Sequence, residues 1–301
     1  MKRTMILLLL LALPAGLHAA GTQRDSLLVM FWNVENFFDW RSGNGPGYWT
    51  RGRFYRKCDA VSKTILRVAD LCGRLPDAVG FAEVENEYVL RQLLSSTLLR
   101  KLDYSIVHFE SPDHRGIDCA LLYRRSSLKL LRAHPAHIRD SSGAVLPTRD
   151  ILVAEFDRLA VLVNHHPSKV GDSGEKADSR ASAMETMQSL CDSLQAAGTG
   201  RILCVGDFNE DVWGDRSRGN FPGTIKYNGR WEKIDGCFAR GDAEVREEIC
   251  AIPELLTEDR AFGGRKPLRT FSGPRWLGGV SDHLPIAVTI FFDTFVDTEK
   301  H

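Results

Sequence analysis

The chain has no excess of charge of either sign, because 39 Lys and Arg balance 39 Asp and Glu over 301 residues. The totals therefore lack the strong basic excess that typifies proteins holding nucleic acid mainly by charge. Basic residues do cluster locally between Arg51 and Lys57, where a solvated helix start and phosphate steering are equally good interpretations. Hydrophobic residues make up 43% and charged residues 26%, which is ordinary for a soluble globular protein with a sizeable core.

The chain also lacks a Cys-x-x-Cys pair, and its seven cysteines are an odd number. A structural zinc site built on thiolates is therefore not expected. Cys119 and Cys204 lie inside apolar runs and are expected to pack as small hydrophobic side chains. One disulfide remains an open alternative, and the sequence does not indicate its partners.

No apolar run is long enough to cross a membrane. The longest candidate, Met5 to Leu13, follows Lys2 and Arg3 and precedes small residues. It is too short to span a bilayer, so residues 1–20 are predicted to be a signal peptide cleaved near 20/21. The mature protein is accordingly expected to be exported, either periplasmic or secreted.

Neither repeats nor a low-complexity linker divide the rest of the chain, so a single domain is predicted over residues 27–293. Strands and amphipathic helices alternate along it, which predicts an α/β sandwich with a mixed set of strands. The helical segments expected here are residues 58–72, 87–99 and 176–195, the last with Ala177, Ala181, Met184, Met187, Leu190 and Leu194 on one face. Between residues 104 and 164, five strands follow in quick succession and are expected to pair as antiparallel neighbours.

Polar side chains stand directly after four of the predicted strands and directly before a fifth. They are Asn33, Glu83, His165, Asp207 with Asn209, and Ser281-Asp282-His283. Because open α/β sheets bind ligands at their strand ends, these residues are expected to form one site. The donors are carboxylate, amide and imidazole groups without a thiolate, which favours Mg²⁺, with Mn²⁺ or Ca²⁺ as alternatives. Taken singly, each residue has an ordinary interpretation as a helix cap, an Asx turn or a surface ion pair.

Seven sequence blocks, in this order, resemble the endonuclease/exonuclease/phosphatase superfamily and its deoxyribonuclease I-like members. The blocks are WNVEN (32–36), AEVEN (82–86), RGIDCALLY (115–123), VNHHPSK (163–169), GDFN (206–209), KIDG (233–236) and SDHLP (281–285). The resemblance implies a four-layer sandwich, in which two mixed β-sheets pack face to face between helices. It also implies hydrolysis of phosphate esters with a divalent metal.

The same resemblance implies roles for individual residues. Glu83 matches the principal metal ligand, assisted by Asn33 and Asp282. Asp207 and Asn209 match the pair that holds and activates the attacking water. His165 and His283 match the histidines that grip the phosphate, and Asp118 and Asp235 match the acids that orient them. The expected pairs are Asp118 with His165 and Asp235 with His283.

The neighbouring histidines leave one assignment open. The family pattern places a histidine directly after Val-Asn, which favours His165, and strand alternation would turn His166 to the other face. A slip of the strand by one residue would reverse this choice. Arg115, Arg149 and Arg180 are candidate phosphate-binding residues, although a structural ion pair is the more common role for each. Arg115 stands near a position where abasic-site endonucleases have a tyrosine, which argues against that activity.

These observations predict a Mg²⁺-dependent phosphodiesterase, and within that class a nuclease acting on DNA. A phosphomonoesterase or a phosphodiesterase directed at phospholipid or inositol phosphate is the alternative, which a hydrophobic membrane-docking loop would favour. A non-catalytic binding module is the third hypothesis, and the intact set of Glu83, Asp207, His165 and His283 argues against it. The sequence indicates no protein partner.

Overall fold

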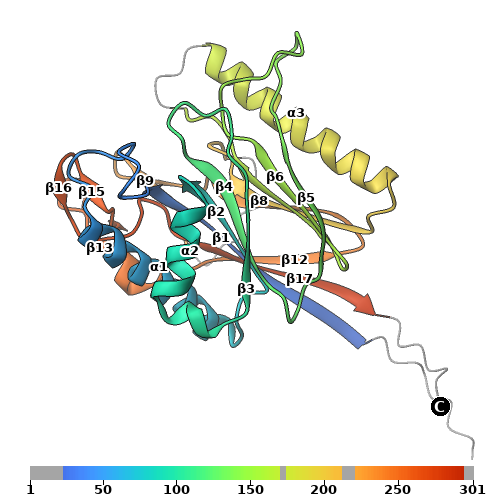
Figure 1. Cartoon of the computed structure of the whole chain (residues 1–301), viewed down its shortest axis with the longest axis horizontal. Helices are drawn as coiled ribbons and strands as arrows, with labels where there is room; N and C mark the ends of the chain where they lie inside the picture. The colour runs from blue at the N-terminus through green and yellow to red at the C-terminus, as the bar shows by residue number, and fades with distance from the viewer. Residues whose placement is uncertain (1–22, 170–173, 212–220, 295–301) are drawn as a thin grey trace, which may run out of the picture.

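Two β-sheets stacked face to face form the centre of the protein, with helices on both outer surfaces (Figure 1). The computed structural model describes residues 23–169, 174–211 and 221–294. This helix–sheet–sheet–helix order confirms the four-layer α/β sandwich predicted from the sequence. The predicted signal peptide lies outside the described residues. Within the described part, no helix has the length and hydropathy needed to cross a membrane.

The first sheet has six strands in the order β12-β17-β1-β2-β4-β3. Their bounds are β1 Gln23–Phe37, β2 Ala78–Val84, β3 Tyr104–His108, β4 Asp118–Arg124, β12 Glu244–Ile249 and β17 Ile286–Thr294. Only the β1–β2 pair is parallel, and the other neighbours are antiparallel. The first and last long strands of the domain thus lie side by side, which brings residues near 33 and 283 together.

The second sheet has five strands in the order β11-β8-β7-β6-β5. Their bounds are β5 Leu130–Ala136, β6 Ile151–Phe156, β7 Ala160–His165, β8 Arg201–Asp207 and β11 Asp235–Gly241. The β7–β8 pair is the parallel one here. Short two-stranded ribbons complete the fold: β9 Ile225–Tyr227 with β10 Arg230–Glu232, β13 Leu256–Glu258 with β14 Arg265–Pro267, and β15 Phe271–Ser272 with β16 Arg275–Trp276.

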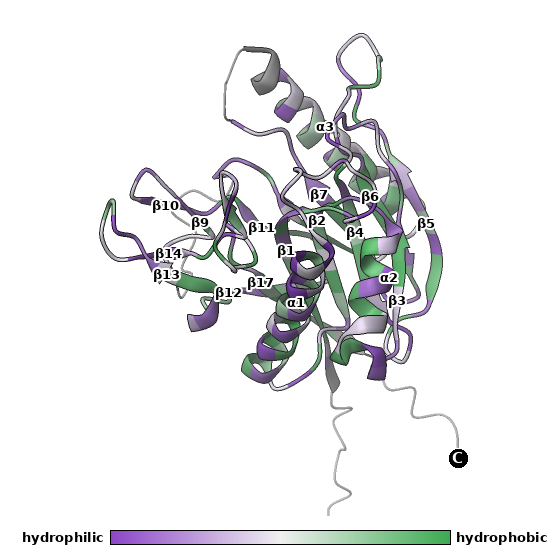
Figure 2. Ribbon diagram, turned by 60° about the vertical axis from the view of Figure 1, so that its left-hand side comes forward, coloured by the Kyte–Doolittle hydropathy of each residue, from purple (hydrophilic) through white to green (hydrophobic). Residues whose placement is uncertain are grey.

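Alternation along the strands of the second sheet gives it two apolar faces. Leu203 and Val205 of β8 join the core between the sheets, whereas Ile202 and Cys204 join the smaller core under helix α3 (Gly174–Ala196). Successive side chains of a strand point to opposite faces, so a strand covered on both sides reads as a continuous apolar run. Figure 2 shows this hydrophobic interior, with hydrophilic residues on the outward surfaces.

Helices α1 (Arg51–Cys72) and α2 (Glu87–Ser96) cover the outer face of the first sheet (Figure 1). Thr50 caps the start of α1 by accepting a hydrogen bond from the Arg53 amide, and Gly73 ends it with φ 69°. A residue without Cβ adopts this left-handed conformation at little cost. The predicted apolar face of α1 is confirmed, since Cys58, Val61, Ile65 and Val68 are fully buried. One turn of 3₁₀ helix, Leu98–Lys101, leads from α2 into β3, and another, Pro253–Leu255, precedes β13.

Two predictions about the middle of the chain are corrected. Strands β4 and β5 do not pair, because the chain crosses from the first sheet to the second between them. A run of short strands does not by itself reveal such a crossing. The buried face of α3 carries Ala183, Met187, Cys191 and Leu194, whereas Ala181 of the predicted face is exposed.

All seven cysteines are free thiols. The expected burial of Cys119 and Cys204 is confirmed. The sulfur atoms of Cys191 on α3 and Cys204 on β8 lie 3.4 Å apart beneath the helix.

Candidate active site

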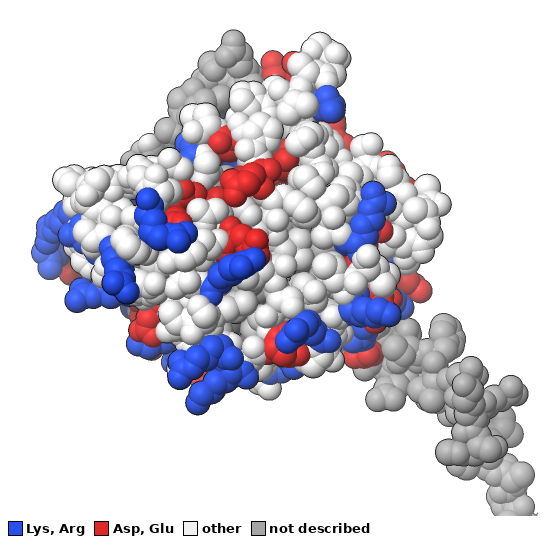
Figure 3. Space-filling view, in the orientation of Figure 1, with Lys and Arg blue, Asp and Glu red and all other residues white. Residues whose placement is uncertain are grey.

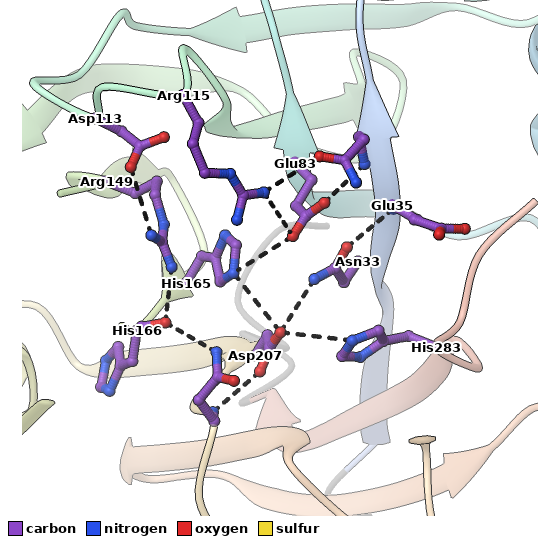
Figure 4. A network of polar contacts seen from close by, with 12 residues as sticks. Asn33, Glu35, Glu83, Asp113, Arg115, Arg149, His165, His166, Asp207 and His283 are labelled. Carbon is purple, nitrogen blue, oxygen red and sulfur yellow. Dashed lines mark hydrogen bonds and ion pairs between the residues drawn. The ribbon is translucent and has the colours of Figure 1, made fainter. Parts of the chain in front are cut away.

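The polar ends of the two parallel strand pairs face each other across a cleft of about 680 Å³. Asn33 and Glu83 reach the cleft from strands β1 and β2 of the first sheet. His165 and Asp207 reach it from strands β7 and β8 of the second sheet. Nine of the twelve predicted site residues line this cleft: Asn33, Glu83, Arg115, Arg149, His165, Asp207, Asn209, Asp282 and His283. The structure thus brings residues that are distant in the sequence together along one cleft. Figure 4 shows the network that connects most of them.

Glu83 is held in place by an amide and an arginine at the end of β2. Its Oε2 accepts a hydrogen bond of 2.7 Å from the Asn36 amide, and its Oε1 lies 3.2 Å from Arg115 Nη2. Burial alone would raise the pKa of Glu83, but Arg115, the Asn36 amide and His283 together lower it below its usual value. Glu83 is therefore a carboxylate at neutral pH, as a metal ligand must be.

Asp207 lies at the centre of the network (Figure 4). Its Oδ2 accepts a 3.0 Å hydrogen bond from Asn33 Nδ2, and its Oδ1 accepts one of 3.0 Å from the Asn209 amide. Burial, followed by the charge of Asp235, raises the pKa of Asp207 to about 7 even though His283 and these hydrogen bonds oppose the shift. A carboxyl group with a pKa near neutrality can both accept and return a proton.

His283 has the aspartate partner predicted for it. Its Nδ1 lies 2.8 Å from Asp235 Oδ2 at the start of β11, and its Nε2 lies 3.9 Å from Asp207 Oδ2. Burial works against the charged imidazole, but Asp235 and Asp207 outweigh it and raise the pKa of His283 well above its ordinary value. The His283 amide donates to Ser281 Oγ at 3.0 Å, and this hydroxyl donates to the Asn33 carbonyl at 2.6 Å. The Ser-Asp-His turn is thus fixed to β1.

His165, rather than His166, faces the cleft. Its Nε2 lies 3.7 Å from Asp207 Oδ2 and 3.9 Å from Glu83 Oε1. The ring of His166 instead packs edge-on against Phe208, with ring centroids 5.0 Å apart. Strand alternation separates the two side chains as expected. Burial, followed by the charges of Arg149 and Arg115, lowers the pKa of His165 well below its ordinary value.

The predicted pairing of Asp118 with His165 is not formed. Asp118 Oδ1 accepts a hydrogen bond of 3.1 Å from the Ser111 amide and another from the Ser111 hydroxyl, and its Oδ2 lies 3.5 Å from His108 Nε2. The Nδ1 of His165 has no hydrogen-bond partner among the described residues. Asp118 is the first residue of β4 and pairs with Val84 of β2, and its side chain lies toward β3. This position follows from strand pairing, which the RGIDCALLY block does not reveal.

The three candidate arginines have different surroundings. Arg115 reaches into the cleft and pairs with Glu83. Arg149 is buried at the cleft wall, where its Nη2 donates to the His166 carbonyl at 2.8 Å and its Nη1 lies 3.5 Å from Asp113. Arg180, on α3, is not among the residues that line the cleft, and its Nε pairs with Glu210 at 2.7 Å. This contact is the structural ion pair weighed above as the more common role for such a residue.

A polar cluster at the edge of the cleft, formed by buried Glu35, Lys57 and Thr270 with exposed Arg269, was not predicted from the sequence. Glu35 accepts hydrogen bonds from Arg269 Nε at 2.8 Å and from the Thr270 amide at 2.9 Å, and Lys57 Nζ donates to the Glu35 carbonyl and to Thr270 Oγ1. Burial lowers the pKa of Lys57 to about 8. Arg269 also lies 3.1 Å from Asp282 Oδ2, so the cluster positions a predicted metal ligand. Glu35 stands within the WNVEN block, two residues after Asn33, and this spacing was the signal that could have identified it.

Backbone conformation also distinguishes the cleft. Five non-glycine residues of the described chain have positive φ, and four of them, Glu35, Asn36, Glu83 and Asn209, line it. Such conformations are uncommon and concentrate at functional sites. At the neighbouring Gly206, an added Cβ would come within 2.6 Å of Asn164, so glycine allows β7 and β8 to approach where they place His165 opposite Asp207.

The cleft fits a divalent cation. Asn33, Glu83 and Asp282 line the cleft with oxygen atoms, and burial followed by the charge of Asp235 raises the pKa of Asp207, the most central carboxyl group, to about 7. Hard divalent cations prefer such oxygen ligands. Donor atoms of Asp207, Asp235 and His283 also lie within 4.8 Å of one another. Within that group, His283 Nδ1 already lies 2.8 Å from Asp235 Oδ2.

Residues 28–221 match the family model described as the endonuclease/exonuclease/phosphatase family. The chain belongs to this family. Members of this family are hydrolases, and the residues around the cleft are those through which the sequence resembles it. Among curated protein sequences no significant match was found.

Solved structures of family members share the fold of this chain. Truncated TDP2 from Caenorhabditis elegans is 18% identical, with 88% of this chain and 97% of that chain covered and a TM-score of 0.55. The mannosyl-6-phosphatase Bt3783 from Bacteroides thetaiotaomicron is 15% identical, with 88% and 99% covered and a TM-score of 0.56. TDP2 from D. rerio is 15% identical, with 88% and 98% covered and a TM-score of 0.52. At these identities the likeness establishes the fold.

Proposed function

We propose that this chain is a divalent-metal-dependent phosphodiesterase that cleaves DNA by attack of water. The observation that carries the proposal is the convergence of Glu83, Asp207, His165 and His283 on one cleft from four separate segments of the chain. A carboxylate poised near neutrality, one imidazole that favours its charged form and one that favours its neutral form are the groups that phosphate hydrolysis requires.

Glu83, Asn33 and Asp282 are the residues that would hold Mg²⁺, Mn²⁺ or Ca²⁺. When bound, such a cation offsets the repulsion between hydroxide and an anionic phosphate and polarises the phosphoryl oxygen. Asp207, oriented by Asn33 and the Asn209 amide, accepts the proton of the attacking water. The pKa of about 7 suits Asp207 to this task.

The two histidines act on the phosphate itself. His283, kept cationic by Asp235, donates from Nε2 to an oxygen that gains negative charge in the transition state. His165 donates as a neutral imidazole beside Arg149 and Arg115. Arg115, on the loop between β3 and β4, is placed to meet a phosphate oxygen by exchanging its contact with Glu83.

Support for a DNA substrate comes from a family member of the same fold. The D. rerio TDP2 structure is a complex with a single-stranded DNA product. The cleft of this chain is open to solvent and adjoins a second pocket of about 360 Å³, with which it shares the lining residues Glu35, Asn36 and Arg269. Tyr48, Trp49 and Phe271 line that pocket, and aromatic side chains of this kind can stack on the bases of a single strand.

A second candidate function is hydrolysis of a small phosphate monoester. Among the residues described on the face seen in Figure 3, Lys and Arg are scattered and acidic residues gather near the centre, so this face offers no continuous basic track for a long nucleic acid. The aromatic pocket could equally hold the sugar of a compact substrate. The Bacteroides relative is a mannosyl-6-phosphatase, which favours this candidate.

The proposal also includes export of the protein, with residues 1–20 cleaved as a signal peptide.

A substrate panel tests the proposal. Purified protein is incubated with supercoiled plasmid, a single-stranded oligonucleotide, RNA, sphingomyelin, inositol phosphates, a sugar 6-phosphate and bis-nitrophenyl phosphate, each with Mg²⁺ and with chelator. We expect Mg²⁺-dependent cleavage of DNA and of the diester, and loss of both on chelation. Turnover of the sugar phosphate with intact DNA would replace the first function by the second.

A further inference from the structure

A second group of metal-binding side chains lies where β3 ends and β4 begins. His108, Glu110 and Asp118 place one ligand atom each within 4.8 Å of one another. None of the three lines the active-site cleft. His108 is the last residue of β3 and Asp118 the first of β4, and these strands are antiparallel neighbours.

Two buried atoms of this group have no hydrogen-bond partner. They are His108 Nε2 and Asp118 Oδ2, on side chains that are 3% and 2% exposed. A buried polar atom without a partner has given up its hydrogen bonds to water without replacement, so such atoms are rare in native proteins. The two atoms lie 3.5 Å apart, within ion-pair distance but without a hydrogen bond between them. Both would be satisfied at once by an ion between them.

The separation of these atoms fits ligands of one ion better than a hydrogen bond. Hydrogen bonds between nitrogen and oxygen are about 2.7–3.2 Å long. Two ligands bound at about 2.0–2.2 Å in a tetrahedral site lie roughly 3.4 Å apart. The observed 3.5 Å is close to the second value. Glu110 is exposed, so its carboxylate adds a third donor on the side from which an ion can enter.

We propose that His108, Glu110 and Asp118 bind a divalent transition-metal ion, Zn²⁺ in the first place, at a site separate from the active site. One imidazole and two carboxylates are ligands that Zn²⁺ accepts, whereas imidazole is a poor ligand for Mg²⁺ and Ca²⁺. The Ser111 amide and hydroxyl hold the remaining oxygen of Asp118 and so fix the direction of this ligand.

Such an ion would stiffen the loop between β3 and β4. Ser111, Asp113 and Arg115 lie on this loop; Ser111 binds Asp118, Asp113 pairs with Arg149, and Arg115 pairs with Glu83 in the cleft. The ion would close the base of the loop, and Arg115 at its far side would be held toward the cleft. The site is thus structural, and it acts on the active site by positioning one arginine.

Zinc uptake by the full chain tests the proposal. Wild-type protein, His108→Ala and Glu110→Gln are dialysed against defined free Zn²⁺, and bound zinc is counted by mass spectrometry. We expect wild type to bind one equivalent more than His108→Ala, and Glu110→Gln to bind that equivalent at least about tenfold more weakly. Glu110 is at the surface, so Glu110→Gln decides the question even if His108→Ala does not fold. Equal uptake and affinity in the three proteins would overturn the proposal.

His134→Ala is the matched control. His134 lies on β5 of the other sheet, and its Nδ1 is also buried without a hydrogen-bond partner. It should bind zinc as wild type does. A second readout is hydrogen exchange of residues 109–117, which Zn²⁺ should slow in wild type and in His134→Ala but not in Glu110→Gln. Zinc protection that persists in Glu110→Gln would also contradict the assignment.

Discussion

His165 and His283 occupy the same cleft and are almost equally buried, yet their surroundings push them in opposite directions. His283 faces the carboxylates of Asp235 and Asp207, and its pKa is raised well above the ordinary value. His165 lies beside Arg149 and Arg115, and its pKa is lowered well below that value. Burial disfavours the charged imidazole in both, so the difference comes from neighbouring charges.

The opposite pKa shifts indicate that the two histidines would not contribute to phosphate binding in the same way. In the mechanism we propose, His283 acts as a cation paired with Asp235, and His165 acts as a neutral donor without an aspartate partner. A pair of titratable groups whose environments drive their pKa values apart indicates separate tasks in catalysis.

Replacing the cationic histidine should have the largest effect. We expect His283→Ala to lower kcat by ~10³-fold or more and His165→Ala by ~10²-fold, as for loss of a charged and a neutral transition-state donor. Single-turnover rates on the best substrate of the panel measure both. His166→Ala should retain activity, since the ring of His166 packs on Phe208 outside the cleft. A larger loss in His165→Ala than in His283→Ala would invert our assignment.

Removing the carboxylate behind His283 should make it resemble His165. Asp235→Asn removes the negative charge that contributes most to raising the pKa of His283. Because the charged imidazole exists below its folded-state pKa and is lost as pH rises through it, the alkaline limb of the pH–rate profile should move to lower pH. We expect a loss of ~10²-fold at pH 8 that shrinks toward acid pH.

Asp118→Asn serves as the matched control for Asp235→Asn. The Asp118 side chain contacts Ser111 and His108 rather than a cleft histidine, so the alkaline limb should stay where it is in wild type. A shift of equal size in both variants would show that Asp118 acts on the histidines after all.

Changing the arginine on the His165 side should have a moderate effect. Arg115→Gln removes a cation that pairs with Glu83 and lines the cleft, and we expect about a tenfold loss in kcat/KM, caused mainly by a rise in KM. Arg180→Gln is the comparison, because Arg180 pairs with Glu210 outside the cleft and its loss should leave KM unchanged. An equal rise in KM for both variants would contradict the assignment of Arg115, rather than Arg180, to substrate binding.

The smallest effect concerns stability, through the histidine that lies next to His165. Burial, followed by Arg149, lowers the pKa of His166 to about 3 from 6.5. Between these values the unfolded chain binds a proton that the folded chain does not, so stability falls as pH drops, by at most about 1.4 kcal/mol per pH unit. His166→Phe, which keeps the ring contact with Phe208, should flatten this slope in urea unfolding at pH 4.5 and 7.0. An unchanged slope would mean that other groups cause it.

Much of the fold could be predicted because it depends on local pattern. Continuous apolar runs marked strands buried on both faces, and the 3- and 4-residue spacing along α1 marked the helix face that is in fact buried. The crossing of the chain between β4 and β5 could not be predicted, since both strands have the same local signature whichever sheet they join. The buried face of α3 was misplaced for a similar reason, because its sequence is apolar on more than one side.

The site divides in the same way. Local pattern was enough to predict which residue types stand at the strand ends and to separate His165 from His166, because a two-residue period is a property of the extended chain. The folded arrangement was needed to show that Asp235 pairs with His283, that Asp118 contacts Ser111 and His108, and that Lys57 and Arg269 contact Glu35. Most of those contacts join residues that are about 20 to more than 200 positions apart in the sequence. No local sequence pattern determines which charged groups become neighbours once water is excluded.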